Sequence, residues 1–171
     1  MVDRMFNKIR RFLAIIVALG VALPAWGAGS VDAGRSAYAA CQSCHSDPTE
    51  PFIARYRFDP DGLGASMSGY VKSTLSALAI SDMASFLGFP NGNDTDRLLN
   101  WGEDTYPQLL SPARQPTGQV LGYTYRYYPA TGIYVGTKDG SVWYYDPRAP
   151  GTAILNLGTM RSFLDLMPNG R

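Results

Sequence analysis

Two cysteines and a histidine stand together in the first third of the chain. Cys41 and Cys44 are the only cysteines of the 171 residues, and His45, which follows directly, is the only histidine. A Cys-x-x-Cys pair can form a tight disulfide, a redox-active dithiol or two thioether bonds to a haem. The adjacent histidine favours the haem, because one helical turn brings both thiols to the vinyl groups and lets the imidazole reach the iron.

The other sites that two close cysteines can form fit this sequence poorly. A zinc site of cysteine and histidine needs further ligands, and the chain has no other residue of either type. A thioredoxin-type site belongs in a βαβ setting, which the sequence pattern lacks. We therefore expect one haem c, bound covalently by Cys41 and Cys44, with His45 as the proximal iron ligand.

The candidates for the distal iron ligand are methionines, since no second histidine exists. Met83 lies in the segment 75–87, whose apolar residues recur every three or four positions, so we expect it in the core of an amphipathic helix. Met67 lies in the small-residue segment 62–69, which we expect to be a loop that approaches the haem edge. Met67 is the expected distal ligand, and a weakly bound, exchangeable methionine stays open.

The N-terminus has the pattern of an export signal. Basic residues precede an apolar run over 12–23, and Ala25-Trp26-Gly27 offers the small residues that a signal peptidase reads. The twelve-residue run would span about 18 Å of a bilayer core of about 30 Å. We expect a cleaved signal peptide over 1–27, no stable membrane anchor, and a periplasmic or extracellular bacterial protein.

Charge gives no sign of a polyanionic partner. The chain has 15 basic and 14 acidic side chains, and 11 and 13 remain without residues 1–27. Such a balance gives no indication that the protein binds nucleic acid.

Three segments follow the signal. Residues 28–90 carry the cysteines, residues 91–97 are polar and turn-forming and predict a linker, and residues 98–171 contain eight of the eleven tyrosines. In the last segment we expect a helix capped by Asp94 or Thr95 that stops before Pro107.

The same segment predicts an antiparallel sheet of about four strands. The expected strands are 120–128, 133–138, 141–145 and 153–157, with a hairpin at Asp139-Gly140 and a short helix from Thr159 to Leu166. Tyr123, Tyr125 and Tyr127 should share one face. The expected fold is thus a set of helices around haem c followed by a small α+β module.

Residues 32–88 resemble the small class I cytochrome c family. The matching features are Gly34-x-x-x-Tyr38 before the Cys-x-x-Cys-His motif, the helix from Ser76 to Phe86-Leu87, and a methionine in a glycine-rich segment before that helix. Asp32 is the expected cap of the first helix. The resemblance implies that this helix crosses the last helix closely at Gly34. It also implies that Phe86 meets Gly34 and Tyr38, and it likewise indicates Met67 as ligand.

Residues 98–166 resemble a module at the C-terminus of assorted bacterial exported proteins, which has no established activity. The shared residues are Trp101-x-Glu103-x-x-Tyr106-Pro107, the run from Tyr125 to Gly136, and Leu157-Gly158-Thr159.

Filled axial positions on the iron predict an electron carrier rather than an enzyme. We expect one-electron transfer with redox partner proteins, to which the C-terminal module docks the carrier. The alternatives are a haem-based gas or redox sensor with a displaceable ligand, a subunit of a larger oxidoreductase, and a binding or adhesion protein that carries a cytochrome domain.

Overall fold

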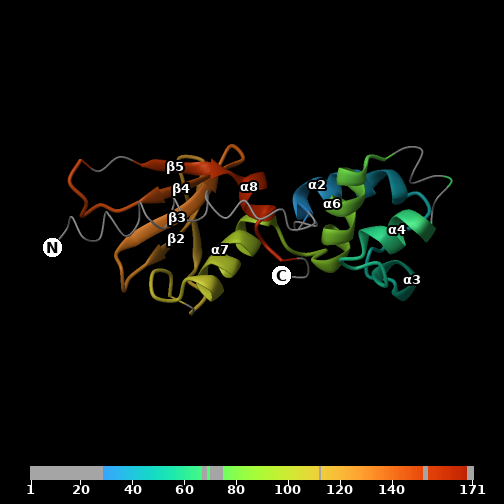
Figure 1. The fold of residues 1–171 in the computed structure, drawn as a ribbon, viewed down its shortest axis with the longest axis horizontal. Coiled ribbons are helices and arrows are strands. Elements are labelled where there is room, and N and C mark those ends of the chain that lie inside the picture. The colour runs from blue at the N-terminus through green and yellow to red at the C-terminus, as the bar shows by residue number, and fades with distance from the viewer. Residues whose placement is uncertain (1–28, 67–68, 70–74, 112, 152–153, 169–171) are drawn as a thin grey trace.

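The computed structural model describes residues 29–66, 69, 75–111, 113–151 and 154–168 (Figure 1). The expected signal peptide and Met67 lie outside these residues. An N-terminal helical half is followed by a five-stranded antiparallel sheet with its own helices, which makes the chain α+β overall. None of the described helices has the length and apolar character needed to cross a membrane.

The helical half is built around two crossing helices. Its elements are α2 (Val31–Tyr38), the 3-10 helix η1 (Ala39–Cys41), α3 (Pro51–Ala54), α4 (Pro60–Ser66) and α6 (Ala77–Gly88). The helix predicted over 75–87 is confirmed, and the Ser76 hydroxyl caps it by accepting from the Ala79 N–H at 3.1 Å. Met83 is 2% exposed, as expected of a core residue.

The cap of α2 differs from the expectation. Ser30, rather than Asp32, precedes the helix in an extended conformation, and its hydroxyl accepts from the Ala33 N–H at 2.9 Å. Asp32 lies within the first turn, where its carboxylate accepts from the Asp94 N–H at 3.2 Å. A serine one residue before the helix satisfies the free N–H groups, which leaves Asp32 available for the second half.

The close crossing of α2 and α6 at Gly34 is confirmed. A Cβ atom on Gly34 would lie 2.0 Å from the Asp82 carbonyl oxygen, so only glycine fits there. The ring of Phe86 meets that of Tyr38, with centroids 5.4 Å apart, whereas Gly34 faces the backbone of Asp82 and Met83.

Replacing Gly34 by alanine should destabilise the protein by about 2–3 kcal/mol, because the methyl group must push two packed helix backbones apart. Urea unfolding of both variants and the wild-type protein measures this change. Ser36→Ala, at an exposed position of the same helix, should stay within about 0.5 kcal/mol. Equal stability of the two variants would contradict the close crossing.

The loop expected over 62–69 is wrong for its first residues, because α4 continues to Ser66. The Asp59 carboxylate accepts from the Gly62 N–H at 2.8 Å, and Pro60 begins the helix with a favourable backbone angle. Burial of Leu63 against the core holds the turn in spite of its glycines. Residue 67 therefore follows directly on a helix end.

The second half begins with α7 (Asp94–Thr105), which starts earlier than expected. Asn93 is its cap, since its side-chain oxygen accepts from the Asp96 N–H at 2.8 Å, and neither Asp94 nor Thr95 takes that role. The acidic first turn suits the positive end of the helix. The helix ends before Pro107, as predicted.

The sheet has five strands rather than four. They are β1 (Thr117–Val120), β2 (Tyr123–Tyr128), β3 (Ile133–Lys138), β4 (Ser141–Tyr145) and β5 (Leu155–Thr159), hydrogen-bonded in that order. The strand expected over 120–128 is divided at Leu121 and Gly122, whose φ angles of 48° and 81° reverse the chain. The predicted hairpin at Asp139-Gly140 is confirmed, with φ angles of 50° and 69°.

The last helix, α8 (Met160–Leu164), is capped by Thr159 as expected but ends two residues before Leu166. Leu164 packs with Leu98 of α7 and Val142 of β4, so the helices cover one side of the sheet.

Polar bonds join the two halves at the start of α2. The Asp94 carboxylate accepts from the Ser30 hydroxyl at 2.5 Å and the Val31 N–H at 2.8 Å. The Arg97 guanidinium donates to the Gly29 carbonyl at 2.9 Å. Arg161 of α8 pairs with Asp82 of α6 at 2.7 Å, and α8 lies between the sheet and α6 (Figure 1). The crossing helices are thus tied directly to the sheet-bearing half.

Candidate functional site

The two cysteines lie on a turn that continues α2. Cys41 ends the 3-10 helix, and its carbonyl accepts from the N–H of Cys44 at 3.1 Å and of His45 at 2.9 Å. Both thiols are free, that of Cys41 half-buried and that of Cys44 exposed. The turn therefore keeps the two sulfur atoms and the imidazole on one short, hydrogen-bonded segment.

A mainly apolar cavity opens beside this turn. Cys41 and His45 belong to its lining, together with residues from α2, α3, α4 and α6. The other lining residues are Tyr38, Phe52, Ile53, Arg55, Tyr56, Leu63, Ser66, Met83 and Leu87. The cavity thus brings the motif together with side chains that lie up to 46 positions away, from Cys41 to Leu87.

The mouth of the cavity carries an aromatic side chain in contact with water. The Phe52 ring is 58% exposed and stacks on the His45 imidazole, with centroids 6.2 Å apart and planes 25° apart. The Arg55 guanidinium lies 4.5 Å from the centre of the same ring. A flat apolar group bound here would cover Phe52, and a cation lies beside it.

The thiol of Cys41 is unsuited to redox exchange. Burial, and secondarily the Cys44 thiolate, raise its pKa above the ordinary value of 9.0. Reactive Cys-x-x-Cys thiols have lowered pKa values, usually at the start of a helix. Cys41 lies instead at the end of a helical stretch, where the helix dipole disfavours an anion. This arrangement fits permanently bonded sulfur better than a thiolate nucleophile.

Tyr38 fixes the backbone of the histidine. Its hydroxyl donates to the His45 carbonyl at 2.8 Å, and its side chain is 2% exposed. Burial, followed by the charges of Cys41, Glu50 and Asp47, raises the pKa of this phenol, so it stays a donor at neutral pH. The aromatic residue expected on the Gly34 face therefore also positions the end of the motif.

The expected distal ligand, Met67, is outside the described residues, directly after the Ser66 that lines the cavity. Met83 does line the cavity, as a core side chain of α6. The sequence-based reasoning missed Phe52, Arg55 and Tyr56. Their signal is weak, since α3 has only four residues and no periodic pattern.

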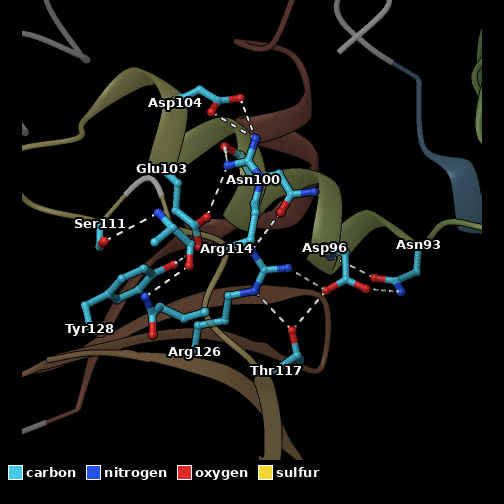
Figure 2. A network of polar contacts seen from close by, with 12 residues as sticks. Asn93, Asp96, Asn100, Glu103, Asp104, Ser111, Arg114, Thr117, Arg126 and Tyr128 are labelled. Carbon is cyan, nitrogen blue, oxygen red and sulfur yellow. Dashed lines mark hydrogen bonds and ion pairs between the residues drawn. The ribbon is translucent and has the colours of Figure 1, made fainter.

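A second polar cluster lies between α7 and the sheet (Figure 2). The Glu103 side chain, which is fully buried, accepts from Arg126 at 2.9 Å, from the Tyr128 hydroxyl at 3.0 Å and from Arg114 at 3.1 Å. Arg126 also pairs with Asp96 at 3.0 Å. No buried side-chain nitrogen or oxygen of this cluster lacks a hydrogen-bond partner, so the cluster fastens the helix to the sheet.

The charges of this cluster support one another. Burial opposes ionisation of Asp96, but hydrogen bonds from Asn93, Thr117 and Arg126 together outweigh it and lower its pKa. Burial, then the charge of Glu103, raise the pKa of Tyr128 above its ordinary value of 10.0.

Alkaline pH should therefore weaken the fold. The Tyr128 phenol ionises near pH 10.0 in the unfolded chain, but its pKa is higher in the folded one. Its contribution to stability is therefore fully present below pH 10.0 and is lost as the pH rises from there through the folded pKa. We expect the free energy of unfolding to fall by up to about 1.4 kcal/mol per pH unit for this group. Urea unfolding between about pH 8 and 11 measures the slope. Tyr128→Phe should reduce it, and an unchanged slope would contradict the role of this phenol.

Among the described residues, no three His, Cys, Asp or Glu side chains gather as a ready-made metal site. No protein-family model, curated protein or solved structure matches the chain.

Proposed function

We propose that this chain is an exported monohaem c-type cytochrome that carries one electron at a time. The observation that carries the proposal is the Cys41-x-x-Cys44-His45 turn at the edge of an apolar cavity. The donor set suits this group: two free thiols for thioether bonds, and one imidazole for the iron. When bound, the haem supplies an iron that alternates between two oxidation states.

The residues around the cavity have distinct tasks in this proposal. Cys41 and Cys44 would hold the porphyrin through thioether bonds, and His45 would bind its iron. Leu63, Met83 and Leu87 exclude water from the cavity. A dry, apolar surrounding keeps the reorganisation on electron transfer small and helps to raise the reduction potential.

The lining of the cavity reaches the residue that precedes Met67 in the chain. Helix α4 ends at Ser66, which lines the cavity, and the Ser66 hydroxyl bonds back to the Leu63 carbonyl at 3.0 Å. In the proposal Met67 supplies the distal ligand, which would leave no open position on the iron for a gas and so favours a carrier over a sensor. Docking to a redox partner through the sheet-bearing half completes the proposal.

The optical spectrum of exported protein tests the ligand set. We expect a pyridine haemochrome spectrum of the two-thioether type and, in the oxidised protein, a sulfur–iron charge-transfer band. Met67→Ala should abolish that band and lower the reduction potential, because the thioether favours Fe(II).

Met83→Leu is the matched control. It changes a buried methionine of the same cavity by a volume-conserving substitution, so the band should persist. Loss of the band in Met83→Leu but not in Met67→Ala would assign the iron bond to Met83. Rapid carbon monoxide binding by the reduced wild-type protein would favour the sensor instead.

A further inference from the structure

The side of the sheet that faces away from α7 is aromatic. Along β2, Arg126 and Tyr128 bond to α7, so the alternating residues Tyr123, Tyr125 and Tyr127 point to the opposite side. The register sets Tyr134, Trp143 and Tyr145 on that side as well. These six residues, which we name the aromatic face, are half-buried except Tyr127, which is 40% exposed.

The rings of the aromatic face meet in two neighbouring groups, which together we name the platform. Tyr134 lies at its centre, with its ring centroid 4.7 Å from Tyr127, 5.7 Å from Tyr125 and 5.7 Å from Tyr145. Tyr123 and Trp143 meet edge to face at 5.8 Å. Rings in such mutual contact lose little further freedom when a ligand binds.

Two glycines leave room for the Tyr125 side chain within the platform. A Cβ atom on Gly136 would lie 2.7 Å from the Tyr125 Cβ, and one on Gly118 would lie 3.0 Å from the ring. Both glycines are direct cross-strand neighbours of Tyr125. The Tyr125 ring therefore lies against the backbone of Gly118, where a larger residue would displace it.

The platform offers neutral polar groups. No carboxylate belongs to its described residues, and the cation beside it, Lys138, donates to the Leu121 carbonyl at 3.0 Å and lies 4.7 Å from the Tyr123 ring centre. Arg148, near the Gly132 turn, pairs with Asp146 at 3.2 Å. Phosphate-rich partners need several free cations along the binding surface, whereas Lys138 is the one cation that the register places on this side of the described strands. An uncharged partner matches it.

We propose that the aromatic face binds a neutral polysaccharide. Sugar rings present C–H groups that pack on the electron-rich faces of aromatic rings, and their hydroxyls pair with phenols. Binding of this kind goes beyond electron transfer and tethers the carrier to a glycan surface.

The test uses full-length, exported, haem-loaded protein. Retention is measured on insoluble cellulose and chitin, and affinity by titration with glucose and N-acetylglucosamine β-1,4-hexasaccharides, followed by tryptophan fluorescence. We expect retention on at least one polymer, with little change between about 0.05 and 0.5 M salt because the partner is uncharged. Tyr134→Ala should weaken binding at least tenfold.

Leu121→Asn is the matched control, since Leu121 is 85% exposed at the turn outside the platform and its positive φ suits asparagine. Binding and melting of this variant should equal those of the wild type, and the melt of Tyr134→Ala shows whether that variant folds. Should Tyr134→Ala unfold, Tyr127→Ala, at the exposed rim, replaces it. Absence of binding to all four probes overturns the proposal, as does binding to a proline-rich peptide alone. The haem spectrum is unaffected by either result, so failure here is distinct from failure of the electron-carrier proposal.

Discussion

Replacing Cys41 and Cys44 together by alanine should abolish covalent haem and leave the helical half without a cooperative unfolding transition. This half has about 60 residues, a length at which a protein core alone gives marginal stability. Its core residues line a cavity next to the motif, and Phe52 at the mouth is 58% exposed. The bound haem would supply the apolar surface that these walls lack.

Circular dichroism and tryptophan fluorescence distinguish the two halves during thermal unfolding of the double variant. The sheet-bearing half should keep its transition, because its buried cluster around Leu98, Val142 and Leu164 shares no residue with the helical core. Gln42→Ala is the control, since Gln42 is exposed within the motif and forms no thioether or iron bond in the proposal. A cooperative melt of the helical half in the double variant would show that haem is not needed for its fold.

The elements that the sequence predicted well are those with complete local signals. Helix α6 has its cap at Ser76 and an apolar stripe along one face, and both features lie within the helix itself. The hairpin at Asp139-Gly140 is equally local, because this dipeptide favours two positive φ angles. In both cases the tertiary structure agrees with the local preference.

The errors arise where the tertiary structure overrides a weak local signal. Leu121 adopts a φ of 48°, which leucine rarely does. The sequence therefore has no typical turn-forming residue at this position to indicate the turn between β1 and β2. The segment that forms α4 is rich in glycine and small residues and suggested a loop, yet burial of Leu63 and the Asp59 cap fold it as a helix. Neither contact can be read from spacing alone.

The candidate site likewise has a part that the sequence predicts and a part that it does not. The Cys41-to-His45 motif spans five positions, so sequence alone defines its chemistry. The cavity draws its walls from four helices, and the partners of Glu103 lie up to 25 positions away at Tyr128. Such long-range sets need the packed structure before they can be recognised.

Glu103→Gln should cost about 3–5 kcal/mol of stability, the second large effect that the structure predicts. The carboxylate is fully buried and accepts from Arg126, Arg114 and the Tyr128 hydroxyl. Glutamine keeps the volume but removes the charge and offers an amide donor where three donors already point. The Arg126 side chain, only 7% exposed, would then keep Asp96 as its acidic partner.

Asp104→Asn is the control that isolates burial from charge. Asp104 pairs with the same Arg114 at 2.9 Å, but its side chain is 49% exposed, so its loss should cost less than about 1 kcal/mol. Urea unfolding followed by tryptophan fluorescence measures both variants. Equal losses for the two would mean that Glu103 contributes no more than a surface ion pair does.

The same experiment shows whether the Glu103 cluster also stabilises the helical half. Helix α7 carries Glu103 near its end, and at its start Asp94 and Arg97 bond to Val31 and Gly29. If this helix transmits the destabilisation, the Soret absorbance of haem-loaded Glu103→Gln should change at the same urea concentration as the tryptophan fluorescence. Separate midpoints would mean that the polar bonds at the start of α2 do not couple the two halves, and that the helical half unfolds independently of the sheet.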